Sequence, residues 1–426
     1  MVEAMPRIRW LIIWMCFLAN AVSYIDRANL AIAAPAIRAE LGIDAAAMGL
    51  VLSAFFWTYA AMQLPAGWFI DKLGVRISLA FAVTWWSVFT MATGAARGVA
   101  QFIGARLMLG IGEAASLPSF TKTAFNWFPR RERGLACAIF NSGSTAGSAL
   151  SLPLVTALIA AVGWRGAFVT TGVLGVVWAL FWWFIYRDPE QYRAIAPREV
   201  DALLAERTAP VAAATVKISW ADLFRYRSIW GLMIGLFCLN FAIYFFITWF
   251  PSYLLQARGF SLASLGTWGA LPAVMAIVGN WMGGYASDRL LKLGWSHTAA
   301  RKTCLVGGMA MASSIGLSAF VESNWACLAL FTLAYASLSF TGANVWTVAS
   351  EIAPTPSHVA SIGGIQNFAG NLAGILITTF TGAMLVLTKG SFLIPLAVAG
   401  ALCLVGALSY LFLVGKVEPL PPLPRG

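Results

Sequence analysis

Residues 67–76 read GWFIDKLGVR and residues 283–294 read GGYASDRLLKLG, so two distant parts of the chain share one pattern. Each segment follows an apolar run and places glycine, then aspartate, then a basic residue. The two aspartates, Asp71 and Asp288, lie 217 residues apart in a chain of 426. A pattern that recurs at half the chain length indicates an internal duplication, with an equivalent turn in each half.

Apolar segments long enough to cross a bilayer follow one another on both sides of these turns. The chain is 60% hydrophobic and 11% charged, whereas a soluble protein usually has about 25% charged residues. We place the spans at 10–36, 46–70, 77–95, 98–125, 135–160, 165–186, 228–255, 262–287, 302–320, 325–350, 359–386 and 391–415. The sequence therefore predicts an all-α polytopic membrane protein with 12 transmembrane helices in two pseudo-symmetric six-helix bundles.

A single long polar stretch separates the two halves. We predict an N-terminal bundle at 1–186, a cytoplasmic central loop at 187–227 and a C-terminal bundle at 228–426. Within the loop, APREVDALLAER (196–207) has the pattern of a short amphipathic helix.

The basic residues indicate the orientation of the chain. Its net charge is +11, and 20 of the 28 lysines and arginines fall on the side of the termini or in the central loop, against five on the opposite side. Cytoplasmic loops carry the excess of positive charge, so we expect both termini in the cytoplasm. The basic excess is thus explained by topology, and we expect no nucleic-acid partner.

Four short motifs carry a resemblance to a known family. They are YIDR (24–27), GARLMLGIGEAASLP (104–118), WFPRRERG (127–134) and FITWFPSYL (246–254). With the duplicated Gly-Asp-basic turn, the chain resembles the major facilitator superfamily. Within it, the chain is similar to the anion:cation symporter branch, which includes bacterial sugar-acid permeases and the vesicular glutamate and sialic-acid transporters.

The resemblance implies a function. It implies a proton-coupled symporter that imports a small organic anion by alternating access. The substrate that it favours is a sugar acid of hexonate or hexarate type. It also implies a multi-pass protein of the bacterial inner membrane that works as a monomer in the lipid bilayer. We expect no cofactor and no metal.

Four charged residues lie well inside predicted spans: Asp26, Arg27, Arg106 and Glu113. A charge at membrane depth costs a few kcal/mol even on the lenient scale. Arg106 and Glu113 are two helical turns apart, about 10 Å along one face. Asp26 and Arg27 point about 100° apart. If spans one and four meet, these residues form a neutral cluster.

The resemblance gives each of these charges a role. In the family, acids matching Asp26 and Glu113 take up protons, and arginines matching Arg27 and Arg106 handle the substrate carboxylate. A second interpretation stays open, in which the charged pairs only hold the first and fourth helices together.

Further polar and aromatic residues are candidates to contact the substrate: Tyr59, Ser144, Tyr244, Asn344, Trp346 and Asn367. Residues of this kind in membrane spans more often make hydrogen bonds between helices or lie at the membrane interface. In sugar-acid permeases, the positions matching Tyr59, Ser144, Trp346 and Asn367 line the cavity. Ser144 stands where hexonate permeases have glutamine, and Ala343 where they have serine, which would suit a less polar acid.

Other residues are candidates for gating and helix packing. Asp71 with Arg76, and Asp288 with Arg289, are expected to latch the cytoplasmic side when the cavity faces outward. Gly-x3-Gly pairs begin at Gly143, Gly279 and Gly370, and such pairs let helices approach closely. The resemblance places these helices where the two halves meet.

Several alternative functions remain. An importer of an aromatic or other small carboxylate would use the same mechanism, whereas a drug-exporting antiporter fits two buried arginines poorly. A membrane sensor that binds an anion without moving it is the alternative of another class. We expect no enzyme, because the sequence has no phosphate-binding loop and no catalytic set of residues within the spans.

Overall fold

The computed structural model describes residues 8–192, 220–353 and 358–420, and within these ranges the regular structure is helical throughout. The first half contains α1 (Ile8–Leu41), α2 (Ala45–Ala95), α3 (Val99–Glu113), α4 (Ser116–Trp127), α5 (Arg130–Ile185) and the short η1 (Pro189–Gln191). The second half contains α7 (Trp220–Leu223), α8 (Arg227–Thr248), α9 (Phe250–Ser252), η2 (Tyr253–Ala257), α10 (Leu262–Thr267), α11 (Leu271–Lys292), α12 (His297–Ala312), α13 (Ser314–Leu317), α14 (Asn324–Ile352), α15 (His358–Leu387), α16 (Leu393–Leu408) and η3 (Ser409–Leu413).

Among the described residues, nine helical segments are long and apolar enough to cross a membrane. One of them, Glu132–Ile185, has the length of two spans. Two more spans are each built from a pair of shorter helices, α3 with α4 and α12 with α13. The prediction of a polytopic all-α protein with twelve transmembrane helices is confirmed.

Two glycines separate consecutive spans inside long helical runs. Gly74 in α2 has φ 78° and Gly163 in α5 has φ 70°. A side chain with a Cβ rarely adopts such a positive φ, so glycine is the residue that permits each break. Gly74 belongs to the GWFIDKLGVR turn from which the duplication was recognised.

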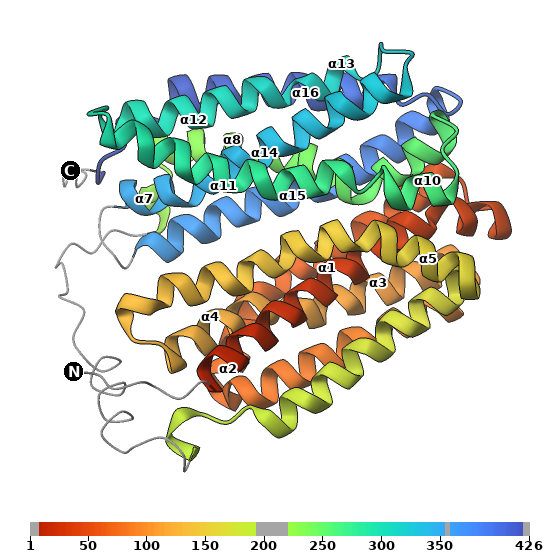
Figure 1. The fold of residues 1–426 in the computed structure, drawn as a ribbon, viewed down its shortest axis with the longest axis horizontal. Coiled ribbons are helices and arrows are strands. Elements are labelled where there is room, and N and C mark those ends of the chain that lie inside the picture. The colour runs from red at the N-terminus through yellow and green to blue at the C-terminus, as the bar shows by residue number, and fades with distance from the viewer. Residues whose placement is uncertain (1–7, 193–219, 354–357, 421–426) are drawn as a thin grey trace. The chain divides into compact units, whose positions relative to one another are not determined.

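The helices form two compact units. One consists of residues 1–43 and 54–213, and the other of residues 44–53 and 214–426. In the first unit α1 packs along α5, and in the second α8 packs along α15 (Figure 1). In both halves the first span therefore packs against the fifth, as expected of duplicated bundles.

The domain boundaries at 1–186, 187–227 and 228–426 stay a prediction. The segment 196–207, for which the sequence predicts a short amphipathic helix, lies outside the described residues.

The glycine pairs pack helices together inside each unit. A Cβ at Gly143 or Gly147 of α5 would collide with the backbone of α1. Gly279 and Gly283 of α11 meet the backbone of α14 in the same way, and Gly370 of α15 faces a side chain of α8. Their expected place where the halves meet stays a prediction, whereas their packing role within each unit is evident.

Candidate functional site

Close packing in the first unit brings Glu113 to Arg27. A Cβ at Gly110 would collide with α2, and the Thr58 hydroxyl of α2 donates to the Leu107 carbonyl of α3 at 2.7 Å. Glu113 is the last residue of α3. Arg27 Nε of α1 donates to Glu113 Oε2 at 2.6 Å, and the Glu113 side chain is fully buried. The meeting of spans one and four is therefore present.

Three aromatic rings surround the Arg27 guanidinium. Its Cζ lies 4.8 Å from the ring centre of Tyr24 and 4.7 Å from those of Phe55 and Tyr59. The Phe55 and Tyr59 rings are stacked, with centres 5.1 Å apart. Cation–π contacts of this kind are strongest where water is excluded. The structure thus brings Tyr59 to the predicted anion-binding arginine and fixes the position of its guanidinium.

The other two charges have different surroundings. Arg106 is buried, and its Nη2 donates to the Arg27 carbonyl at 3.3 Å, so it too faces α1. Asp26 is fully buried, and neither carboxylate oxygen has a hydrogen-bond partner in the described protein. Within the predicted cluster, the structure therefore shows an Arg27–Glu113 ion pair with Arg106 beside it, whereas Asp26 forms no ion pair with the described residues.

This arrangement suits anion binding coupled to proton uptake. Arginine binds carboxylates through two parallel hydrogen bonds, which makes it selective for planar anions. Removing one partner of a buried ion pair leaves an uncompensated charge and is strongly unfavourable. An anion that takes Arg27 from Glu113 would therefore favour protonation of Glu113.

Asn344 of α14 makes hydrogen bonds to neighbouring helices. Its side chain is buried, and Nδ2 donates to the Gly283 carbonyl of α11 at 3.0 Å. Its Oδ1 accepts from Arg301 Nη1 at 3.4 Å. The structure therefore places Asn344 in a network with Arg301, and its predicted contact with substrate stays a prediction.

The other candidate substrate residues are spread over several helices. The Ser144 hydroxyl donates to the Asn141 carbonyl within α5 at 2.7 Å. Trp346 of α14 is half exposed and lies against Gly363 of α15, 3.8 Å from a Cβ built there. Tyr244 of α8 and Asn367 of α15 are partly buried. Their roles in substrate binding stay predictions.

Asp71, which is predicted to latch the cytoplasmic side in the first half, has an unexpected partner. Asp71 Oδ1 pairs with Lys122 Nζ of α4 at 2.6 Å. Arg76 instead donates to the Trp183 carbonyl at 3.1 and 2.7 Å, with its Cζ 4.4 Å from the Trp183 ring centre. The contact made by Asp71 therefore ties α2 to α4 within one unit.

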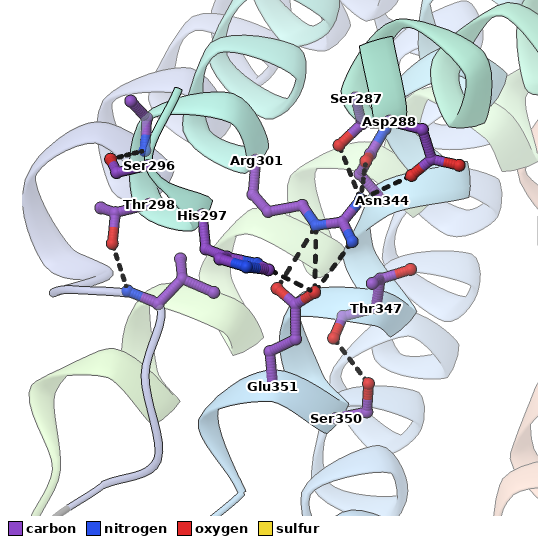
Figure 2. A network of polar contacts seen from close by, with 12 residues as sticks. Ser287, Asp288, Ser296, His297, Thr298, Arg301, Asn344, Thr347, Ser350 and Glu351 are labelled. Carbon is purple, nitrogen blue, oxygen red and sulfur yellow. Dashed lines mark hydrogen bonds and ion pairs between the residues drawn. The ribbon is translucent and has the colours of Figure 1, made fainter. Parts of the chain in front are cut away.

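The second half has a larger polar network around Arg301 of α12 (Figure 2). Arg301 is buried, and its Nη2 lies 2.8 Å from Glu351 Oε1 while its Nη1 donates to Ser287 at 2.6 Å. Asp288 Oδ1 lies 3.9 Å from Arg301 Nη1, whereas Arg289 is exposed. The basic partner of Asp288 is therefore Arg301 of the next helix, and the network joins α11, α12 and α14.

Sequence reasoning missed several of these contacts. Tyr24 precedes Arg27 by three residues and Phe55 precedes Tyr59 by four, so helical spacing alone could have placed each pair on one face. The pairing of Arg301 with Glu351 had no such signal, because it joins residues fifty apart on different helices.

Metal ligands do not cluster in the part of the chain that the structure describes. Among residues 8–192, 220–353 and 358–420, no three His, Cys, Asp or Glu side chains lie together as a metal site would require.

Comparisons with known proteins agree on the family. The sequence model of the Major Facilitator Superfamily matches residues 16–378. The chain is 34% identical to the D-galactonate transporter of Escherichia coli O6:H1, over 97% of both chains. It is 36% identical to the probable galactarate/D-glucarate transporter GarP of Escherichia coli K12, over 96% of this chain and 95% of the relative. It is 34% identical to the probable sulfoacetate transporter SauU of Cupriavidus necator, over 95% and 94%.

Solved structures share the fold at low sequence identity. An inward-facing, unoccupied bacterial homologue of the human lysosomal transporter Spinster has a TM-score of 0.75 at 19% identity, over 96% of both chains. The inward-open xylose transporter XylE of Escherichia coli has a TM-score of 0.73 at 14% identity, over 96% and 97%. The relatives named here are transporters, which agrees with the prediction that the chain is not an enzyme.

Proposed function

This chain belongs to the major facilitator superfamily, and from that membership we propose that it is a proton-coupled symporter that imports a sugar acid by alternating access. The observation that carries the proposal is the buried Arg27–Glu113 ion pair, with Arg106 beside it. The site thus holds both a binder for a carboxylate and a carrier for a proton.

The relatives and the arginines together support the substrate class. The relatives are named for galactonate, galactarate and D-glucarate, which are sugar acids with one or two carboxylates. Arg27 and Arg106 supply the matching positive charge, and the Tyr59 ring makes a cation–π contact with the Arg27 guanidinium. In this proposal Ser144, Tyr244, Asn344, Trp346 and Asn367 contact the remainder of the substrate.

Coupling follows from competition for Arg27. When the substrate carboxylate binds the guanidinium, Glu113 loses the partner of its buried charge and takes up a proton. The substrate-loaded, protonated carrier then reorients and releases its cargo and the Glu113 proton inside. It returns once the ionised Glu113 has re-formed the ion pair with Arg27. Asp26 is the second proton acceptor in this scheme.

A smaller or less polar anion is the second candidate substrate. The relative SauU is named for sulfoacetate, and Ser144 and Ala343 replace larger polar groups of the hexonate permeases. An aromatic carboxylate is also a less polar anion and is part of this second candidate. A non-transporting anion sensor is disfavoured by the names of the relatives.

Uptake into proteoliposomes tests the proposal. The purified chain would be given labelled galactonate, galactarate, glucarate, sulfoacetate and an aromatic carboxylate, with and without an inward proton gradient. We expect accumulation of a sugar acid that depends on the gradient. Accumulation of none of these anions would contradict the proposal, and gradient-driven uptake of sulfoacetate alone would favour the second candidate.

We further propose a monomer in the bacterial inner membrane with both termini in the cytoplasm. The distribution of basic residues supports this orientation. Labelling of cysteines introduced near either end, from each side of the membrane, would test it.

A further inference from the structure

Asp26 has a different environment from the three other charges of the site. It is fully buried, and neither carboxylate oxygen has a hydrogen-bond partner in the described part of the chain. Arg27 pairs with Glu113, and Arg106, whose charge acts on Asp26, donates to a backbone carbonyl. Burying a carboxylate in this way is strongly unfavourable unless something compensates its charge.

Side chains that carry oxygen atoms lie close to the Asp26 carboxylate. Thr90 of α2 and Thr171 of α5 lie beside it. Asn29, three residues further along α1, donates its Nδ2 to Thr171 Oγ1 at 3.0 Å. All four side chains are at most 1% exposed. Among the residues that the structure describes, the Asn29 Oδ1 and Thr90 Oγ1 atoms, like both Asp26 oxygens, find no hydrogen-bond partner.

From this cluster we propose that Asp26, Asn29, Thr90 and Thr171 form a binding site for a monovalent alkali cation, sodium in particular. Hard cations take carboxylate, carbonyl and hydroxyl oxygens as ligands, which are the groups present. The single carboxylate and the nearby Arg106 favour a monovalent ion, because a divalent ion would leave excess positive charge in a dry interior.

The charges of the whole site fit this assignment. The formal charges of Asp26, Arg27, Arg106 and Glu113 sum to zero, and in the proposed transport a proton on Glu113 balances the first carboxylate of the substrate. A sodium ion at Asp26 balances the second carboxylate of a dicarboxylate such as galactarate. The role of sodium in transport rests on the function proposed above, whereas its binding rests on the cluster alone. Protons and sodium would compete for the same carboxylate.

Binding of radioactive sodium to the purified full chain tests the site. The measurement is made without substrate, at alkaline pH, with choline as the replacement salt. We expect saturable binding that declines as the pH is lowered, because protons displace the ion. Absence of saturable sodium binding would overturn the proposal.

Matched variants locate the ion. Thr90→Val keeps the shape of the side chain but removes its oxygen, so sodium affinity should fall about tenfold, and Thr90→Ser should restore it. Asp26→Asn should abolish binding. Thr93→Val is the control, because Thr93 is equally buried on the same helix and its hydroxyl donates to the Phe89 carbonyl.

The outcomes separate this site from the proposed function. Unchanged sodium affinity in both Asp26→Asn and Thr90→Val would place the ion elsewhere and overturn the assignment. Gradient-driven sugar-acid uptake in sodium-free buffer, measured in parallel, reports on the proposed transport alone. A failure of that uptake would leave the result of the binding experiment intact.

Discussion

At the scale of single residues, Arg27 makes most of the contacts on which the proposed site depends. Its guanidinium pairs with Glu113 at 2.6 Å and lies against the rings of Tyr24, Phe55 and Tyr59. A planar, delocalised cation can make these contacts at once, whereas the compact ammonium of lysine cannot. The residue type at this position therefore follows from its surroundings.

Replacing the arginines should weaken substrate binding. We expect Arg27→Ala and Arg106→Ala each to reduce affinity by about 2 kcal/mol, or roughly thirtyfold, because each loses charge-assisted hydrogen bonds to the carboxylate. Arg27→Lys should recover little of this loss. Isothermal calorimetry with the transported acid measures it, with Arg38→Lys on the same helix as control. Unchanged affinity in both alanine variants would remove the arginines from the site.

The sequence identified the charged residues of the site but not all of their partners. Asp26, Arg27, Arg106 and Glu113 were conspicuous because charges are rare in apolar spans. Which of them pair depends on helix rotation and on the approach of α3 to α2 at Gly110, and sequence spacing does not encode these. The pairing of Asp71 with Lys122 escaped prediction for the same reason.

At the scale of elements, glycines set how closely the helices pack. Gly147 of α5 faces the backbone of α1 at Ala21, and a Cβ there would collide with it. Asn20 of α1 also donates to the Phe140 carbonyl of α5 at 2.8 Å. The helix that carries Asp26 and Arg27 is thus held in place by small residues and a hydrogen bond.

Enlarging Gly147 should loosen this contact. We expect Gly147→Ala to lower the stability of the protein by about 1–3 kcal/mol, because overpacking forces the two backbones apart. Gly134→Ala is the matched control on α5, since a Cβ there meets nothing within 4 Å. Thermal unfolding in detergent compares the two variants. Equal unfolding temperatures would show that α1 and α5 tolerate the extra methyl group.

Most of the helices could be predicted, because twenty-residue apolar runs leave little alternative in a membrane. The duplicated turn also predicted two equivalent bundles, and the structure adds that the first span packs against the fifth in both halves. The division of the fourth span into α3 and α4, directly after Glu113, was not foreseen. That break depends on local backbone geometry rather than on hydropathy.

At the scale of the whole molecule, alternating access requires the two halves to reorient. The aspartates of the duplicated turns are the predicted latches, and within their own units Asp71 pairs with Lys122 and Asp288 lies near Arg301. The Asp71 side chain is mostly exposed, so its ion pair contributes little to stability.

Asp71→Asn should therefore change the conformational balance more than the fold. We expect a shift toward the inward-facing state, with substrate affinity retained, because a latch of the outward-facing state is lost. Labelling of cysteines introduced on each side of the membrane measures this balance, with Arg97→Gln as an exposed control outside the predicted latches. An unchanged labelling pattern would leave Asp71 as a turn residue.

The central claim is that Glu113 carries the proton that drives uptake. Glu113→Gln imitates the protonated carboxyl in size and neutrality, so the loaded carrier should still reorient. It cannot release a proton, and it cannot re-form the charged pair with Arg27, so the empty carrier should fail to return.

The most direct test measures gradient-driven uptake and counterflow in the same proteoliposomes. For Glu113→Gln we predict that net accumulation collapses while exchange of external for internal substrate persists. Glu190→Gln, in the exposed turn after α5, should behave as the unmodified chain in both assays. If Glu113→Gln still accumulates substrate in response to the proton gradient, Glu113 is a structural acid and the account of coupling is wrong.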